Sequence, residues 1–326
     1  MVRAEGPAFV VGANLPWIDY GGDVGASAWS PEGGLGRPDR AARLDEVLGR
    51  AADHGIGTVR WFLLCDGRAG IDHDDRGRPL GLDRFVRRDL DVALRALDRA
   101  GLRAWFVLFD FLLVYGRRQH AGVQLFGRRA WVRDVEARAR LMEHVVVPLV
   151  AHASDAAAVA GWDLMNEPEW VTFGAGGWLP WGCVSRATMR RFLADARDAV
   201  RQRSGRPVTV GLASLRGLDL VRGLGLDLYH VHWYDHVAPP WALVTPAASH
   251  ALDAPLWLGE FPTATSSQSP VGIVSAARHA GYAGAFGWSL CADDRFSSAA
   301  GCYEAARYCR RSNSDPATGN PQTVPR

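Results

Sequence analysis

Short apolar runs alternate with amphipathic segments along most of the chain, and this alternation indicates the fold. The amphipathic segments carry apolar residues at helical spacing, for example Leu44, Val47, Leu48 and Ala51, which predicts helices that bury one face. The apolar runs predict eight strands, over residues 8–14, 58–64, 104–109, 159–165, 207–212, 228–234, 255–262 and 283–290. Strands that alternate with helices in this way predict a single-domain α/β protein with a (β/α)8 TIM barrel.

Two of the predicted strands end on a glutamate close to a proline. The first reads Asn166-Glu167-Pro168 at its end, and the second reads Gly259-Glu260-Phe261-Pro262. Proline cannot donate a further ladder hydrogen bond, so each carboxylate is expected at the mouth of the barrel. Two carboxylates, one protonated and one ionised, are the groups that glycoside hydrolysis requires.

The surroundings of Glu167 suggest which carboxylate carries the proton. Trp162 and Trp170 flank it in the sequence, and partly apolar surroundings disfavour a charged carboxylate. We therefore expect the pKa of Glu167 to be raised toward that of a general acid.

Polar residues inside other predicted strands also need an explanation. Arg60 falls within a strand, where a cation is costly unless it meets an anion. His230, His232 and Tyr234 alternate along another strand, so they share one face. A His-x-His pair on a strand is also a metal-ligand pattern, and a metal-dependent barrel hydrolase that uses His230 and His232 is an alternative interpretation.

The order of these motifs resembles a known family. Asn166-Glu167-Pro168, Gly259-Glu260-Phe261 and, between them, His232-Trp233-Tyr234 are similar to motifs of the retaining (β/α)8-barrel glycoside hydrolase clan, most closely family 5 with its cellulases and mannanases. The resemblance extends over roughly residues 8–310. One departure is Asp110, at the end of the strand over residues 104–109, where the cellulases commonly have a histidine.

The resemblance implies roles for individual residues. Glu167 would be the acid/base and Glu260 the nucleophile, with Arg60 and Tyr234 holding the nucleophile. The other residues that the resemblance places at the substrate are Asn166 at the sugar 2-hydroxyl, His232 near the acid/base and Trp288 beneath the sugar.

Tryptophan is abundant, with 13 in the chain, and several lie in loops rich in glycine and proline. Flat aromatic faces bind the apolar faces of sugar rings, so loop tryptophans are candidate sugar platforms, with simple loop packing as the alternative. The candidates are Trp17, Trp170, Trp178 and Trp181.

Length and composition narrow the function further. We expect residues 1–310 to form the catalytic domain and residues 311–326, rich in Ser, Asn, Pro and Thr, to be a disordered tail. A net charge of +2 gives no electrostatic case for nucleic acid or anionic membrane as a partner. The five cysteines have no CxxC spacing, which argues against a zinc site or a disulfide framework. Without a signal-peptide pattern at the start, the chain is expected to be cytoplasmic as given, or secreted with the signal peptide already removed.

Together these features predict a retaining β-glycoside hydrolase that cleaves a β-linked oligo- or polysaccharide, of the β-glucan or β-mannan type, by double displacement. No cofactor or metal is expected. Besides the metal-dependent hydrolase, a non-catalytic carbohydrate-binding barrel is the other alternative, although a site that only binds sugar does not need both glutamates. The sequence does not predict the oligomeric state or the choice between endo and exo action.

Overall fold

The protein is a closed barrel of parallel strands surrounded by helices, as predicted. The computed structural model describes residues 9–179 and 181–314, with side chains up to residue 311. Within these residues eight parallel strands close in the order β1-β12-β11-β10-β9-β8-β5-β2. Their bounds are Val10–Asn14 for β1, Thr58–Phe62 for β2, Arg103–Asp110 for β5, Val159–Asn166 for β8, Val208–Leu212 for β9, Tyr229–His232 for β10, Leu256–Pro262 for β11 and Gly284–Trp288 for β12.

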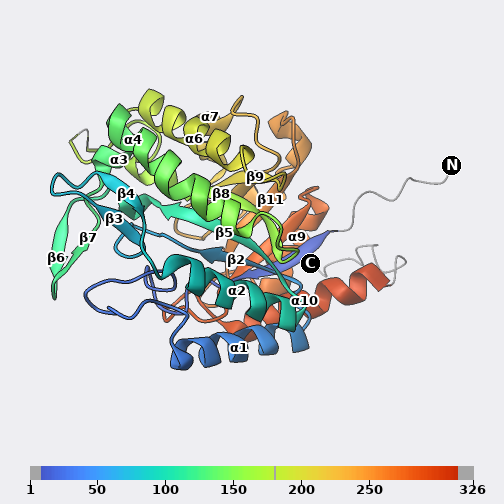
Figure 1. Ribbon diagram of the computed structural model, residues 1–326. Helices are drawn as coiled ribbons and strands as arrows, with labels where there is room; N and C mark the ends of the chain where they lie inside the picture. Colours follow the sequence, from blue (N-terminus) through green and yellow to red (C-terminus); the bar gives the residue numbers. More distant parts are fainter. Residues whose placement is uncertain (1–8, 180, 315–326) are drawn as a thin grey trace.

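The helices pack outside the barrel and bury the predicted apolar stripes. Figure 1 shows the strands between a layer that contains α1 and α2 and one that contains α4 and α6. Leu44, Leu48 and Ala51 are buried on α1, and Gly101 ends α2 in the left-handed conformation that glycine adopts without strain. The helix bounds are Pro38–Asp53 for α1, Val86–Ala100 for α2, Arg129–Arg133 for α3, Arg186–Arg201 for α6, Leu218–Val221 for α7, Trp241–Val244 for α8, Pro270–His279 for α9 and Ala299–Ser314 for α10.

The predicted helix near residues 135–149 contains a wider turn. It consists of α4 (Val135–Leu141), a π-helical turn η2 (Met142–Val146) and α5 (Val147–Ala153). Pro148 lies at the start of α5 and has no N–H to donate to the turn before it. A π turn at this point accommodates the missing hydrogen bond, and the helix continues.

Two loops that follow barrel strands contain short hairpins. The acidic loop after β2 forms the strands β3 (Ile71–His73) and β4 (Pro79–Leu82), and the loop after β5 forms β6 (Arg118–His120) and β7 (Val123–Leu125). Figure 1 places both hairpins on the side of the view away from α10, with β6 and β7 projecting furthest. Short antiparallel strands of this kind have no long apolar run in the sequence to predict them.

Two predicted boundaries are corrected. Strand β10 ends at His232, so Tyr234 lies beyond the strand, and the pairing of β10 with β11 shifts register between Val231 and His232. A register shift at the mouth of a barrel redirects the side chains that follow it. Helix α10 continues through Ser314, into the segment predicted as a tail, and residues 315–326 lie outside the described part.

The structure also bears on disulfide bonds and on membrane-spanning helices. The five cysteines, all of them in the described part of the chain, are free, so no disulfide bond cross-links the barrel. In the part of the chain that the structure describes, no helix is both long and apolar enough to cross a membrane.

Candidate active site

Glu167 follows the last residue of β8 in a conformation that few non-glycine residues adopt. Its φ of 48° and ψ of 49° lie in the left-handed region, and Pro168 then begins the short helix η3 (Pro168–Val171). Its backbone N–H donates to the Gly211 carbonyl of β9 at 2.7 Å, which fixes this turn against the barrel. Backbone strain of this kind persists only where neighbouring structure holds it, and it is common at functional sites.

The Glu167 carboxylate has two hydrogen-bond partners and points into the barrel mouth. Trp170 Nε1 donates to Oε2 at 2.8 Å, and His232 Nδ1 lies 2.8 Å from Oε1. Of the two tryptophans that flank Glu167 in the sequence, Trp170 forms this contact, whereas Trp162 donates to the hydroxyl of Ser204 and packs in the core. The expectation that Trp162 borders the carboxylate was therefore wrong.

Glu260, on β11, has a cation and a phenol as partners. Arg60 Nη1 donates to Oε1 at 2.6 Å, and the Tyr234 hydroxyl donates to Oε2 at 3.0 Å. The residue is 4% exposed, so both interactions are largely shielded from water. Charge-assisted hydrogen bonds in such a place hold the carboxylate ionised and in one orientation.

His232 brings the two carboxylates together. Its Nδ1 lies 2.8 Å from Glu167 Oε1 and 3.5 Å from Glu260 Oε2. One oxygen of each glutamate and one ring nitrogen of His232 all lie within 4.8 Å of one another. Retaining glycosidases place their two carboxyl groups about 5 to 5.5 Å apart, and the observed separation fits that class.

The partners of the two glutamates decide where a single proton resides. Burial raises the pKa of Glu167, and the Trp170 hydrogen bond offsets this only in part. Burial and the nearby Glu167 raise the pKa of Glu260 too, but the charge of Arg60 and the hydrogen bond from Tyr234 act in the opposite direction. Burial lowers the pKa of His232 to about 4, so its ring is neutral near pH 7. Because Arg60 contacts Glu260 directly, we assign the proton of the pair to Glu167.

Arg60 is the centre of a buried network beneath the glutamates. It is fully buried, and its guanidinium donates to Asp163 Oδ2 at 2.9 Å, Asn166 Oδ1 at 2.9 Å and Asn14 Oδ1 at 3.2 Å, besides Glu260. Burial alone would raise the pKa of Asp163, but Arg60 and His230 outweigh it and lower the pKa to about 2. Sequence reasoning missed Asp163, although a charged residue inside an apolar strand is the same signal that singled out Arg60.

Strand β9 offered no obvious chemistry in the sequence, yet it shapes the site through Gly211. The Gly211 N–H donates to Asp163 Oδ1 at 2.9 Å. A Cβ at this position would lie 2.4 Å from Arg60 Nη2 and 3.1 Å from His232 Nε2. The absence of a side chain therefore makes room for the network.

A cavity of about 370 Å³ lies over the two glutamates. Trp288 forms part of its wall, donates through Nε1 to Asp294 Oδ2 at 2.9 Å and packs edge to face against Trp17. Predicted residues in the lining are Trp17, Asn166, Glu167, Trp170, Tyr234, Glu260 and Trp288. The cavity also includes residues that the sequence analysis did not assign to the site, among them Phe62, Asp110, His236, Asp294 and Phe296.

A larger cavity, of about 820 Å³, adjoins the first one. Phe111 and Trp170 line both cavities, so the two lie next to each other on the side of Trp170, whose indole N–H contacts Glu167. Trp178 lines this second cavity and is 86% exposed. Trp181 is also exposed but is in the lining of neither cavity, so the structure separates two tryptophans that the sequence had grouped.

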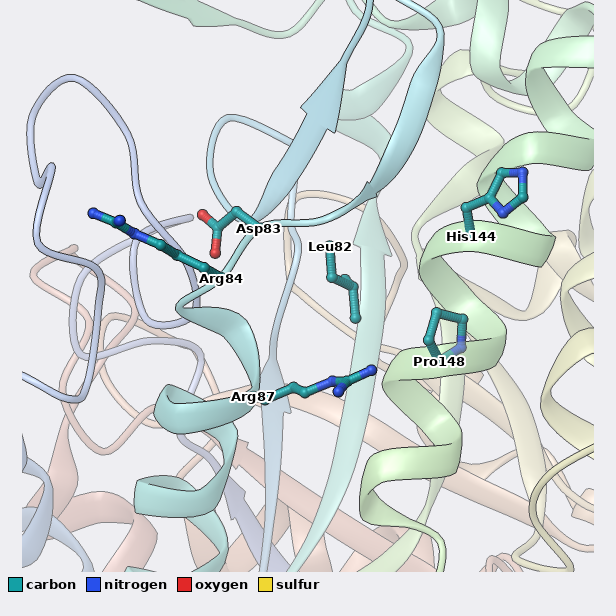
Figure 2. A pocket seen from close by; sticks show the side chains of 6 residues that line it. All are labelled: Leu82, Asp83, Arg84, Arg87, His144 and Pro148. Carbon is teal, nitrogen blue, oxygen red and sulfur yellow. The ribbon is translucent and has the colours of Figure 1, made fainter.

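A third cavity, of about 300 Å³, lies away from the barrel mouth (Figure 2). It lies between the start of α2 and the π turn with α5. Figure 2 shows Arg87 extending toward Pro148, while the guanidinium of Arg84 lies on the side away from Pro148. None of the candidate catalytic residues lines it, so we do not assign the site there.

The strand β10 histidines do not form a joint metal site. Their rings are perpendicular, with centroids 5.9 Å apart. His230 lies beside Asp163, with Nδ1 3.5 Å from Oδ2, whereas His232 faces the two glutamates. The geometry therefore gives little support to the metal-dependent alternative, which needs both rings at one ion.

Comparisons with known proteins concern the sequence and the fold of the chain. No family model matches the chain. A segment of 161 residues is 26% identical to a mannan endo-1,4-beta-mannosidase of Mytilus edulis, and it spans 49% of this chain but only 40% of that relative. The structure of the beta-mannanase from the blue mussel Mytilus edulis is similar to this one, with a TM-score of 0.77 and 22% identity over 96% of this chain and 93% of the mussel chain.

The chain has the (β/α)8 fold of the β-mannanases. The endo-1,4-beta-mannanase of Eisenia fetida is similar as well, with a TM-score of 0.76 and 22% identity over 94% of this chain and 92% of that one. The beta-1,4-mannanase of the sea hare Aplysia kurodai has a TM-score of 0.73 and 20% identity over 96% and 94% of the two chains. The predicted resemblance to the retaining barrel glycoside hydrolases of family 5, and the predicted fold, are thereby confirmed.

Proposed function

We propose that the protein is a retaining β-glycoside hydrolase that cleaves β-linked mannan. The observation that carries this proposal is the carboxylate pair, with Glu167 and Glu260 oxygens within 4.8 Å of each other at the mouth of the barrel. The choice of mannan rests on the mussel relative, which is a mannan endo-1,4-beta-mannosidase, and on mannanases of the same fold.

The two glutamates divide the reaction into two steps. In the first, Glu260 attacks the anomeric carbon as the glycosidic bond breaks, and Glu167 gives its proton to the leaving oxygen. In the second, Glu167 takes a proton from water while the water oxygen attacks the anomeric carbon and releases Glu260. The spacing of these carboxyl oxygens, at most 4.8 Å, is shorter than the about 6.5 to 9.5 Å that inverting enzymes use to admit a water, which favours this double displacement.

The neighbours of each glutamate suit these roles. Arg60 and Tyr234 stabilise the negative charge of Glu260, both before attack and after its release. Burial raises the pKa of Tyr234 well above its usual value, so the phenol remains a donor throughout. The two side chains that contact the Glu167 carboxyl, Trp170 and the neutral ring of His232, carry no charge, and so Glu167 keeps its proton until the leaving oxygen takes it.

The second cavity supports action on long chains. The sugar that leaves is the one on the Glu167 side, because that residue supplies the proton. Trp170 hydrogen-bonds Glu167 and also lines the second cavity, so leaving-group sugars would continue into a space of about 820 Å³. Trp178 and Tyr115 in that lining offer aromatic faces for them.

The stereochemistry of the product tests the mechanism. We expect proton NMR of a mannan-oligosaccharide digest to show the β anomer first, because two inversions retain configuration. An α anomer appearing first would rule out Glu260 as nucleophile. A barrel that only binds carbohydrate would bind without turnover, and a metal-dependent hydrolase would lose activity on treatment with a chelator and regain it with an added ion.

Azide tests the two roles separately. It is a small nucleophile that needs no general base, so it should rescue Glu167→Ala on an aryl substrate to a β-glycosyl azide. Glu260→Ala forms no covalent intermediate and should give, if anything, the α product. The opposite pairing of variant and product would mean that the two roles are exchanged.

A further inference from the structure

Asp110 lies at the barrel mouth, where the sequence departs from the cellulases that it otherwise resembles. It is the last residue of β5 and pairs in register with Asn166 on β8. It is 5% exposed and lines the cavity over the two glutamates. A buried carboxyl that faces a binding cavity is costly unless it has partners there.

The two oxygens of Asp110 have different partners. Oδ1 accepts from the Leu112 backbone N–H at 2.8 Å and so caps the short helix η1 (Phe111–Leu113). Oδ2 accepts from Asn166 Nδ2 at 3.3 Å. Since Oδ1 already satisfies a cap, Oδ2 is the atom available to a ligand.

The orientation of the Asn166 amide follows from its neighbours. Arg60 Nη2 donates to Asn166 Oδ1 at 2.9 Å, so the amide oxygen faces the arginine and the amide nitrogen faces Asp110. An N–H donor and a carboxyl oxygen thus lie side by side on one wall of the cavity, next to Glu167. A sugar hydroxyl donates one hydrogen bond and accepts others, so one hydroxyl can use both groups.

We propose that Asp110 is a specificity-determining residue whose Oδ2 accepts a hydrogen bond from the sugar hydroxyl next to the anomeric carbon, while the same hydroxyl accepts from Asn166 Nδ2. This inference rests on the proposed function and makes it more specific. The pair of groups has a fixed direction, because Leu112 and Arg60 anchor its outer ends. Sugars that differ in the orientation of this hydroxyl are then distinguished, since the wrong one leaves buried polar groups unpaired.

The test combines a variant with a change in the substrate. Aryl β-manno-oligosides are prepared with and without the 2-hydroxyl on the sugar that carries the aryl group. Asp110→Asn keeps an oxygen for the Leu112 cap but turns an NH₂ toward Asn166 Nδ2, so two donors face each other. We expect kcat/KM of this variant to fall by about 10- to 100-fold on the hydroxylated substrate and by less than about threefold on the 2-deoxy substrate.

A matched control and a second variant make the outcome decisive. Asp134 caps α4 in the same way, accepting from the Ala137 N–H at 2.9 Å, so Asp134→Asn should leave both substrates unaffected. If Asp110→Asn does not fold, Asp110→Ser retains an oxygen for the cap and lacks the second oxygen. Equal losses on both substrates, or no loss on either, would overturn the role of Asp110. If the wild-type protein hydrolyses neither substrate, the proposed function itself fails instead.

Discussion

At the scale of single residues, Arg60 determines the charge state of the site. Its guanidinium contacts Glu260, Asp163 and Asn166, so one buried cation compensates carboxylates on two different strands. Removing one partner of a buried ion network destabilises the folded protein more than forming the network stabilises it. The remaining charges then stay buried without a partner and without water. The sequence indicated this cation, and the structure adds Asp163 as a second anion.

Replacing Arg60 by methionine should remove the positive charge that keeps Glu260 ionised. Turnover is expected to fall by about 100-fold or more, because Glu260 loses the charge that stabilises its ionised form. The pKa of Glu260 rises without the arginine, so the acid limb of the pH–activity profile should move to higher pH.

The measurement is kcat against pH for folded protein, as judged by circular dichroism. Tyr234→Phe should also lower turnover, whereas Tyr282→Phe, which removes a buried phenol outside the catalytic cavity, should not. An Arg60→Met protein that is folded and retains most of its activity would contradict the assignment.

At the scale of elements, β9 contributes to the site through Gly211 rather than through a side chain. Replacing Gly211 by alanine would place a Cβ 2.4 Å from Arg60 Nη2 and 2.8 Å from Asp163 Oδ2. We expect a loss of about 1 to 3 kcal/mol in the free energy of unfolding from this overpacking, together with lower turnover as the network shifts.

Gly205→Ala is the matched control, because a Cβ there meets no atom within 4 Å. Urea unfolding and steady-state kinetics on the two variants provide the comparison. Unchanged stability and turnover in Gly211→Ala would show that Arg60 has room to move without consequence.

The loop between β8 and α6 carries two exposed tryptophans with different surroundings. Trp178 lines the second cavity, whereas Trp181 is in the lining of neither cavity near the glutamates. Trp178→Ala should therefore raise KM for long oligosaccharides, by about 5- to 50-fold for a lost stacking contact, while the melting temperature hardly changes.

Trp181→Ala is the control, and its KM should stay near the wild-type value. Kinetics on short and long substrates test the difference between the two variants. Equal effects would mean that both residues bind sugar, and a loss of stability with unaltered kinetics would mean that both pack the loop.

At the scale of the whole molecule, buried acids make stability depend on pH. Burial raises the pKa of Glu169 to about 8, while backbone hydrogen bonds lower it in part and the nearby Glu167 raises it. Between the ordinary pKa of a glutamate and pH 8, Glu169 has lost its proton in the unfolded chain but keeps it in the folded protein. The free energy of unfolding therefore falls as pH rises. Burial lowers the pKa values of His230 and His232 to about 4, which has the opposite effect, but only below pH 6.5.

We therefore expect the free energy of unfolding to fall by about 2 kcal/mol between pH 6.5 and pH 8 from Glu169 alone, at about 1.4 kcal/mol per pH unit. Burial also raises the pKa of Asp110, to about 7, and this adds to the decline. Urea unfolding at the two pH values measures the change.

Glu169→Gln removes the titrating group and should flatten the dependence, whereas the exposed Glu304→Gln should keep the wild-type slope. A slope that is the same in wild type and Glu169→Gln would show that Glu169 is ionised in the folded protein.

The sequence by itself determined the barrel and the two glutamates. Both are local signals, because a buried strand needs an apolar run and a strand that ends on a carboxylate and a proline must place that carboxylate at the mouth. Arg60 was visible for the same reason, as a charge where the pattern allowed none. Helix α1 and its buried stripe of Leu44, Leu48 and Ala51 followed from helical spacing.

Only the tertiary structure decided which groups meet. Asp163 and Arg60 lie 103 positions apart, Arg60 and Glu260 lie 200 apart, and only closure of the barrel brings them into contact. The short hairpins, the room made by Gly211 and the separation of Trp178 from Trp181 depend on loop packing and strand register, which have no periodic signal in the chain. A local pattern specifies where a side chain leaves its strand, whereas its partners are set by contacts between segments that are distant in sequence.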